Sequence, residues 1–515
     1  MAAIPTIPEY FSEKNVFITG GSGFIGKVLI EKLLRSCPDI GKIYLLIRPK
    51  KGKNSQERIQ FMTDLPLFDV LKKSFPENLA KIVPISGDVK ELELGLSPQD
   101  KKTLIDEVHI VYHIAASVRF DDPLKDAVLM NTRGTREVVR LAKEMKHLDV
   151  LMHFSTTYCN TDKQIIEEQI YPPHADWEKT IELAETLDAH VLDVLSVKYI
   201  HPLPNTYTFT KSLGEHVIAD LCDGQVPSVI FRPSIVISTM TDPFSGWIDN
   251  FNGPVGILVA SGKGVMRACY ANKENIADYV PCDSVVKAVI MATWSKGLEK
   301  NESEKNKVSV YNASNYDVKQ VTFGEIIDIG KQLTWEIPVN DVVWYPDGSI
   351  YSCWYAFYTI FIVYQLIPSL FLDALLLIMG YKPILLKIQR KIYIANMALR
   401  YYLTNQWKFP NKKVLELENK LLPSDFPHFN YEKQHKLAEP FNYFSVAMMG
   451  CRRYLLKETD ETLDNAKVHF KRMYLLAQVF NSLWYIAGAV ILFYIYNKLD
   501  LVSKLNDIHT FFNTP

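Results

Sequence analysis

A glycine-punctuated segment near the start of the chain constrains the fold more than any other feature. The apolar run at residues 16–18 stops at a turn carrying Gly20, Gly23 and Gly26, and an amphipathic segment follows. This order predicts a buried strand, a tight turn and a helix, as in dinucleotide-binding folds. There the glycines make the turn, let backbone N–H groups approach a pyrophosphate and let helix and strand pack closely. An ordinary strand–turn–helix is the alternative. We expect cofactor contacts from Thr19, Gly20, Gly23, Phe24, Ile25 and Gly26.

The second and third strands end in residues that bear on the choice of cofactor. Residues 42–48 predict a strand that ends in Arg48, with Lys50 and Lys51 behind it and no acid. An acid at this position binds the 2′-hydroxyl of NAD, whereas a basic residue accommodates the 2′-phosphate of NADP. The sequence therefore favours NADPH, with a solvated basic loop as the alternative. Residues 81–88 predict a third strand that ends in Asp88. This carboxylate is suited to contact the edge of the adenine ring, and capping of the next helix is the alternative.

The following segments keep the same alternation of strands and helices. Residues 108–116 predict a fourth strand that runs into small residues, among which Ala115 would let a flat cofactor pass close to the backbone. Residues 150–158 predict a fifth strand ending in hydroxyls, and residues 228–237 predict another. Asn131 falls in a helix start at residues 130–135 and is a further expected cofactor contact. This alternation predicts an α/β fold with a doubly wound parallel sheet of the Rossmann type.

A tyrosine and a lysine four residues apart form the candidate catalytic pair. Tyr207 and Lys211 would lie on one helix face, where the ammonium can lower the pKa of the phenol. The same spacing occurs from Tyr10 and from Tyr494, so the spacing alone is weak. Only Tyr207 falls between the fifth and the next strand, where it can face the cofactor. The position of Tyr207 in the chain, and not the spacing, therefore makes it the candidate catalytic tyrosine.

Composition restricts the classes of partner. The 515 residues are 48% hydrophobic and 22% charged, with a formal net charge of −1, which gives no argument for nucleic acid. The seven cysteines are dispersed without a Cys-x-x-Cys pair or a metal-ligand spacing with histidine. We expect reduced thiols, no metal and no nucleic-acid partner.

Longer stretches resemble the animal, alcohol-forming fatty acyl-CoA reductases, which are extended short-chain dehydrogenases. They are residues 11–32, 113–121, 153–158, 232–236 and the run Pro243-Phe-Ser-Gly-Trp-Ile-Asp-Asn-Phe-Asn-Gly-Pro254. The resemblance covers nearly the whole chain, and this last run is far more specific than the glycine spacing. It implies reduction of a long-chain fatty acyl-CoA to a primary alcohol with two NADPH.

The resemblance also implies roles for single residues. Tyr207 would protonate the carbonyl oxygen, and Lys211 would hold the ribose hydroxyls. Thr156 would be the third catalytic residue, with Ser155 as the near alternative, and a turn-capping hydroxyl remains open for either. Further contacts would come from Pro233 against the nicotinamide, and from Lys263 and Arg267 at the CoA phosphates unless these two lie in a solvated loop.

The C-terminal third contains two long apolar stretches. Residues 354–379 are interrupted by Pro368 and Asp373, and residues 354–380 are more apolar than the resemblance implies. We expect a re-entrant or interfacial hairpin or the wall of an acyl tunnel, and a buried helical pair is the alternative. Residues 473–496 are long enough to cross a bilayer, with core packing of a last helix as the alternative. The predicted domains are residues 1–350, a helical accessory domain at 351–460 and the membrane helix at 473–496.

Charges beside the last apolar run favour one orientation. Lys467, Lys471 and Arg472 precede it, and Lys498 and Lys504 follow it. This mildly favours a single-pass protein with its catalytic body in the cytosol. The endoplasmic reticulum and the peroxisome both remain open, as does the oligomeric state. The rival functions are a membrane-associated hydroxysteroid dehydrogenase and a non-enzymatic NADP-binding membrane scaffold.

Overall fold

The computed structural model describes residues 4–48, 54–431 and 439–498. Lys50, Lys51 and Lys504, which entered the cofactor and orientation predictions, lie outside the described residues.

Seven parallel strands form the central sheet, in the order β10-β6-β5-β4-β1-β2-β3. The chain winds outward in both directions from β1 and β4, so the strand order reverses between these two neighbours. Ligands of such sheets bind at this point, beyond the carboxyl ends of the strands. The strands are β1 (Asn15–Thr19), β2 (Ile43–Ile47), β3 (Ile82–Ser86), β4 (Val108–His113), β5 (Val150–Phe154), β6 (Ser228–Pro233) and β10 (Ser309–Ala313).

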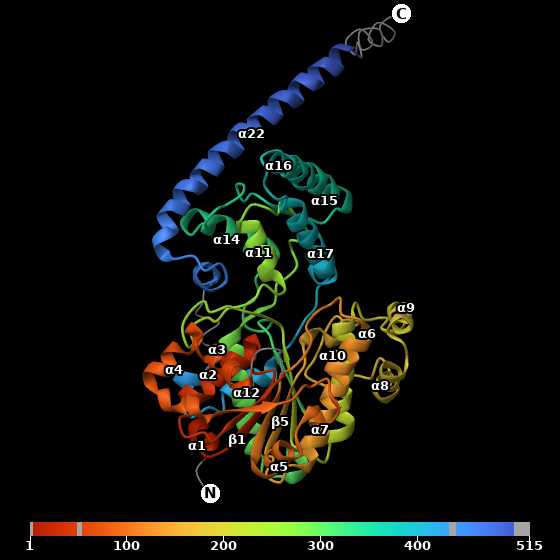
Figure 1. Cartoon of the computed structure of the whole chain (residues 1–515), viewed down its shortest axis with the longest axis vertical. Helices are drawn as coiled ribbons and strands as arrows, with labels where there is room; N and C mark the ends of the chain where they lie inside the picture. Colours follow the sequence, from red (N-terminus) through yellow and green to blue (C-terminus); the bar gives the residue numbers. More distant parts are fainter. Residues whose placement is uncertain (1–3, 49–53, 432–438, 499–515) are drawn as a thin grey trace, which may run out of the picture.

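Helices cover both faces of the sheet (Figure 1). On one face lie α2 (Phe24–Ser36) and α12 (Cys282–Gly297), and on the other α7 (Gly134–Glu144) and α10 (Thr206–Cys222). Each face has its own apolar core, because the strands of a parallel sheet are buried on both sides. The predicted doubly wound Rossmann fold is confirmed. The other helices of this body are α1 (Ile7–Phe11), α3 (Ser55–Thr63), α4 (Asp69–Ser74), α5 (Pro98–Glu107), α6 (Leu124–Ala127), α8 (Trp177–Thr186), α9 (Ala189–Tyr199), α13 (Glu302–Lys305), α18 (Lys412–Glu418) and α19 (Phe426–Phe429).

A second group of elements stands beyond the carboxyl ends of the strands (Figure 1). Two small parallel sheets pair β7 (Ile235–Ile237) with β9 (Tyr279–Pro281) and β8 (Ala268–Tyr270) with β11 (Ser349–Tyr351). The helices around them are α11 (Pro254–Gly262), α14 (Phe323–Glu336), α15 (Trp354–Ile360), α16 (Ile367–Ile378), α17 (Leu385–Thr404), α21 (Pro440–Gly450) and α22 (Leu463–Lys498). Short 3₁₀ turns cover Pro66–Phe68, Pro76–Lys81, Leu92–Gly95, Thr157–Asn160 and Asp460–Thr462, and π-helical turns cover Val128–Arg133, Phe361–Leu366 and Cys451–Leu455.

Two local predictions in the body are wrong. The strand predicted at 228–237 breaks at Ser234, because the Ser234 hydroxyl donates to the carbonyl of Asp278 and directs β7 into the small sheet with β9. Asn131 is not at a helix start, since it lies within the π-helical turn that joins α6 to α7.

Residues 354–378 form one continuous helix made of α15, a π-helical turn and α16, so the predicted hairpin is wrong. The Ile367 N–H donates to the carbonyl of Ile362, and this π-type bond precedes Pro368, which begins α16 without breaking the helix. Asp373 does not interrupt it either. Its carboxylate accepts the backbone N–H groups of residues 384–386 and so caps α17. Much of the helix surface is exposed, which also excludes the buried helical pair.

The helix α22 extends away from the rest of the protein (Figure 1). Its residues from Leu475 onward are mostly exposed, so the alternative of a core-packed last helix is wrong. The stretches Trp354–Ile378 and Asp460–Asn497 are both long and apolar enough to cross a membrane. Length and composition are weak evidence for crossing, and the first stretch is tied to the body at its middle.

Candidate active site

The glycine turn brings the ends of β1 and β4 into backbone contact. Gly20 has a φ of +75°, and a Cβ there would lie 2.5 Å from the backbone nitrogen of Ala115. A Cβ on Gly26 would lie 2.5 Å from the Cα of Gly21. Both positions therefore require glycine, the first for its dihedral angle and both for the close approach. Ala115 therefore lies directly against the turn, and its contact with the cofactor stays a prediction.

The first turn of α2 has the features of an anion site. Its N-cap is Gly23, and no side chain among the described residues caps the leading N–H groups of this helix, which include those of Phe24 and Ile25. Free N–H groups at a helix N-terminus suit a pyrophosphate. A nicotinamide dinucleotide therefore fits this turn.

Thr19 is placed differently from the prediction. Its side chain is fully buried, and its hydroxyl lies 2.8 Å from Nδ1 of His113 and accepts the N–H of Ala115 at 3.3 Å. The hydroxyl thus joins β1 to β4 beneath the turn. Thr19 supports the cofactor site from behind and its side chain does not face it.

Arg48 and Asp88 come together at the ends of β2 and β3. Arg48 Nε lies 4.0 Å from Asp88 Oδ2, and the Arg48 side chain is 69% exposed. Asp88 Oδ1 accepts the N–H of Lys90, while Ser97 caps the next helix, so Asp88 is not a helix cap. Because Arg48 is mostly exposed, its guanidinium lies at the edge of the sheet where an adenosine ribose would lie.

Tyr207, Thr156 and Lys211 meet at the end of β5. Asn205 caps α10 by accepting the N–H of Thr208, which places Tyr207 in the first turn. Burial raises the pKa of Tyr207 to about 12, against the opposing effect of a hydrogen bond with Thr156. Lys211 donates to the carbonyl of Phe154 at 2.6 Å, and burial lowers the pKa of its ammonium to about 8. The expected lowering of the phenol pKa by Lys211 is therefore not seen.

The neighbouring Ser155 faces another group. Its N–H donates to the carbonyl of Phe231, and its hydroxyl is close enough to Glu215 to lower the pKa of that carboxyl. Glu215 forms a bidentate ion pair with Arg232, and both side chains are buried. Thr156, not Ser155, is thus on the side of Tyr207.

Asn131 and Pro233 complete this end of the sheet. The Asn131 amide accepts from the backbone N–H of Ser117 and donates to the carbonyl of Ser117 and to the hydroxyl of Thr210. It holds the loop after β4 against α10 and is itself 1% exposed. Pro233 is buried at the last position of β6, directly after Arg232.

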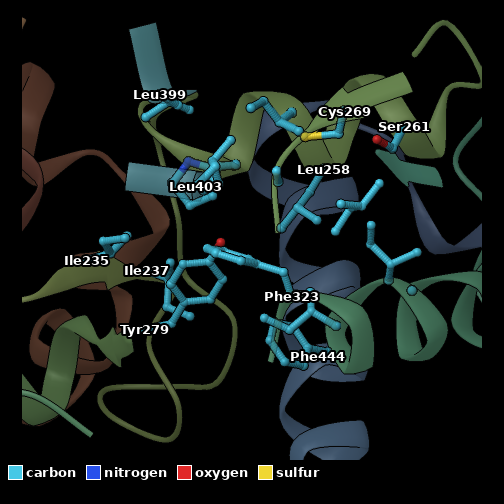
Figure 2. A pocket seen from close by; sticks show the side chains of 18 of the residues that line it. Ile235, Ile237, Leu258, Ser261, Cys269, Tyr279, Phe323, Leu399, Leu403 and Phe444 are labelled. Carbon is cyan, nitrogen blue, oxygen red and sulfur yellow. The ribbon is translucent and has the colours of Figure 1, made fainter. Parts of the chain in front are cut away.

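An apolar cavity of about 250 Å³ is lined in part by residues that follow β5 and β6. The lining includes Tyr158, which is two residues after Thr156, and Ile235, which is two residues after Pro233. Figure 2 shows side chains from both small sheets and from several helices directed into it. They include Ile237, Leu258, Tyr279, Phe323, Leu399, Leu403 and Phe444.

Aromatic rings connect the cavity to Tyr207. The Phe120 ring lies 5.8 Å from that of Tyr207 and 5.1 Å from that of Tyr402, which lines the cavity. Asn205, the cap of α10, also donates to the Tyr402 hydroxyl. Sequence reasoning missed Phe120, Tyr402 and Asn205, although the Asn205-x-x-Thr208 spacing is typical of a helix N-cap. None of residues 354–379 lines this cavity, so they are not its wall.

The two residues expected at the CoA phosphates are engaged elsewhere. Lys263 pairs with Glu458 at 3.3 Å and donates to the carbonyl of Asn340, and Arg267 pairs with Asp347 at 2.7 Å. Both side chains are mostly buried, so the solvated-loop alternative is wrong, and their contact with CoA phosphates stays a prediction. Within the described residues, no cluster of three or more His, Cys, Asp or Glu could hold a metal.

Comparison with known proteins gives consistent matches. A family model of the NAD-binding type, described as "Male sterility protein", matches residues 18–289, and a second model with that description matches residues 364–458. Rat "Fatty acyl-CoA reductase 1" is 36% identical over 480 residues, covering 93% of this chain and 92% of the relative. The Drosophila "Fatty acyl-CoA reductase wat" is also 36% identical, with coverages of 93% and 91%.

Solved structures share the fold. The reductase domain of a nonribosomal peptide synthetase from Mycobacterium tuberculosis superposes with a TM-score of 0.57 at 17% identity, covering 87% of this chain and 93% of that domain. The terminal R domain of the myxalamid pathway gives 0.54 at 17%, with coverages of 85% and 90%. At such identities the likeness concerns the fold alone.

Proposed function

Because the chain belongs to the fatty acyl-CoA reductase family, we propose that it reduces long-chain fatty acyl-CoA to primary alcohol with two NADPH. The observation that carries the proposal is the apolar cavity, which the rings of Phe120 and Tyr402 connect to Tyr207. An acyl chain in this cavity would place its thioester at Tyr207, Thr156 and the end of β6. Burial of each CH₂ contributes about 0.8 kcal/mol, so long chains would be held far better than short ones.

Tyr207 is the proposed proton donor. Its raised pKa of about 12 keeps the phenol protonated at neutral pH, so it can donate to the carbonyl oxygen. Thr156 lies close enough to the phenol to oppose the rise in its pKa, and Lys211, bound to the carbonyl of Phe154, would position the ribose with its remaining N–H groups. The dinucleotide would be held by the glycine turn, Asn131 would position the loop beside it, and Pro233 would contact the nicotinamide.

The reaction balances as two successive reductions at one site. When bound, NADPH would supply one hydride to the carbonyl carbon in each of them. In the first, Tyr207 would donate its proton to the carbonyl oxygen, and the resulting hydroxyl would return that proton to Tyr207 as the C–S bond breaks, the aldehyde forms and CoA leaves as thiolate. In the second, Tyr207 protonates the aldehyde oxygen to give the alcohol. The sequence contains one glycine turn and one correctly placed Tyr/Lys pair, so both steps must use them.

Product stoichiometry tests this function. We expect two NADPH oxidised per long-chain acyl-CoA, alcohol as the main product and little aldehyde captured by a carbonyl trap. The measurement is NADPH oxidation and product analysis with acyl-CoAs of graded length. One NADPH per acyl-CoA with trapped aldehyde would show that the reaction stops halfway. Turnover of a hydroxysteroid but of no acyl-CoA would favour the rival dehydrogenase.

Arg48 is proposed to read the 2′-phosphate of NADPH. Reversing its charge in Arg48→Glu should weaken NADPH binding about tenfold or more and NADH binding much less, because only the former carries that phosphate. Fluorescence titration with both cofactors measures the change. Lys42→Glu makes the same charge change at the opposite end of β2 and serves as the control. An unaltered NADPH/NADH preference in Arg48→Glu would assign the phosphate to another residue.

The helix α22 is proposed to anchor the protein in the membrane with its body on the cytosolic side, in the endoplasmic reticulum or the peroxisome. Deletion from Met473 onward retains Phe470, which packs with Val339 and Val342, and removes the apolar part of the helix. We expect the truncated protein to leave alkaline-washed membranes and appear in the supernatant. Complete retention in the washed pellet would place the anchor elsewhere.

A further inference from the structure

The helix at residues 354–378, called here the outer helix, presents a large apolar surface to solvent. Tyr355 on α15 and Ile378 on α16 are each 82% exposed, and Phe371 on α16 is 63% exposed. Other exposed apolar side chains include Ile367, Leu370, Leu377 and Met379. Contiguous exposed apolar surface of this kind marks an interaction site.

A row of exposed cations adjoins this surface. Lys382, Lys387, Arg390 and Lys391 are exposed in and just before α17, the helix that follows. Residues 354–404 contain five basic residues and one acid, giving +5 − 1 = +4, whereas the whole chain carries −1. The one acid, Asp373, is buried and bonded to the N-terminus of α17.

The outer helix is fastened to the body along its other side. Phe357 and Phe361 are buried against Ala268 of β8. Gln365, in the middle of the helix, accepts the backbone N–H groups of Arg267 and Ala268 and donates to Gln389. A helix held at its middle by the body cannot pass through a bilayer, so it can only lie along a membrane surface.

The outer helix and α22 lie at the same end of the molecule (Figure 1). We propose that the outer helix, with the cations of residues 382–391, docks on an anionic lipid bilayer and forms a second membrane contact beside the anchor. An apolar face edged by Lys and Arg is the pattern of a helix lying in the interface of an anionic membrane. The concentrated positive charge would repel a second copy of the same surface, which disfavours a dimer. The inference does not depend on the reductase activity.

Docking would bring one wall of the cavity to the membrane. The strands β8 and β11, against which the outer helix packs, supply Ala268, Cys269 and Ile350 to the cavity lining. An acyl chain held in the bilayer would therefore be separated from the cavity by the outer helix and by the strands β8 and β11 on which it packs.

Lipid-depth quenching of two single-site probes tests the docking. The full-length chain with Cys353→Ser, which removes an exposed thiol, carries a fluorophore at Phe371→Cys or at Leu483→Cys on α22. The Leu483 probe reports the anchor and the Phe371 probe reports the docking surface, so the two proposals fail separately. Vesicles contain phosphatidylcholine with or without phosphatidylserine, and the quencher is a lipid spin-labelled near the headgroup or at the bilayer centre.

We expect the Phe371 probe to be quenched mainly by the shallow label, and about twofold more when phosphatidylserine is present. The variant Lys387→Glu/Arg390→Glu/Lys391→Glu should abolish this difference while the Leu483 probe is unchanged. The matched variant Lys102→Glu/Lys300→Glu/Lys307→Glu reverses three exposed lysines outside this surface and should have no effect.

Several results would overturn the proposal. The first is an unquenched Phe371 probe in anionic vesicles, and the second is equal quenching in neutral vesicles or in the charge-reversed variant. The third is stronger quenching by the label at the bilayer centre than by the label near the headgroup. The fourth is chemical cross-linking of this surface to a second copy of the chain.

Discussion

Tyr207→Phe should lower kcat by a factor on the order of 10² or more and leave folding and NADPH binding intact. The substitution removes one hydroxyl and little volume, so the first turn of α10 and its Asn205 cap persist. The variant lacks the phenolic proton, which Tyr207 keeps at neutral pH because burial raises its pKa. Steady-state kinetics with a long-chain acyl-CoA, together with NADPH fluorescence titration, separate kcat from binding.

Tyr10→Phe is the matched control, because Tyr10 also precedes a lysine by four residues. Its hydroxyl is buried without a hydrogen-bond partner in the described part of the chain, and it packs in α1 away from the site. We expect wild-type kcat from Tyr10→Phe. Wild-type kcat from Tyr207→Phe would remove Tyr207 as the proton donor.

Glu215→Leu should destabilise the protein by about 3–5 kcal/mol, because it leaves the buried Arg232 guanidinium without its carboxylate. The bonds from Arg232 Nε and Nη2 to Glu215 are both 2.7 Å, and Arg232 also donates to the carbonyls of Glu167 and Gln169. Burial alone would raise the pKa of Glu215, but the charge and hydrogen bonds of Arg232 lower it overall. Denaturant unfolding measured in detergent gives the change in free energy.

The double variant Glu215→Leu/Arg232→Met removes both charges and should recover part of the loss, since no buried charge remains unpaired. Recovery is incomplete because the carbonyls of Glu167 and Gln169 lose their donor. Glu274→Leu, at an exposed pair with Lys273, should cost about 0.5 kcal/mol or less. A loss in Glu215→Leu as small as that would show that the pair contributes little to stability.

The native Glu215–Arg232 pair also predicts acid sensitivity. A carboxyl whose pKa is lower in the folded than in the unfolded chain adds stability above its unfolded pKa of about 4.3. That contribution is lost as the pH falls from there through the lower, folded pKa. The stability of Glu215→Leu should therefore depend less on pH in this acidic range than that of the wild type.

Local sterics and chain order allowed much of the fold to be predicted from the sequence. Gly20 and Gly26 occupy positions that admit only glycine, so their spacing indicates the turn, and the order of strands and helices leads to the parallel sheet. Tyr207 was selected over Tyr10 because it follows the fifth strand. In a parallel sheet the carboxyl ends of all strands lie at one edge, so chain order indicates which residues lie there. The length and apolar character of α22 are likewise local properties of its residues.

Contacts between distant segments decided what the sequence alone could not. The partners of Lys263 and Arg267, Glu458 and Asp347, are far along the chain, so neither residue's engagement could be inferred from its neighbours. In the sequence Asp373 interrupts an apolar stretch, whereas in the structure its carboxylate caps the start of α17, which lies beyond the end of that stretch. The cavity draws on segments between residues 158 and 451, because only packing of the whole chain encloses it. Periodicity and sterics act over a few residues, whereas ion pairs, caps and cavities depend on which surfaces the tertiary fold brings together.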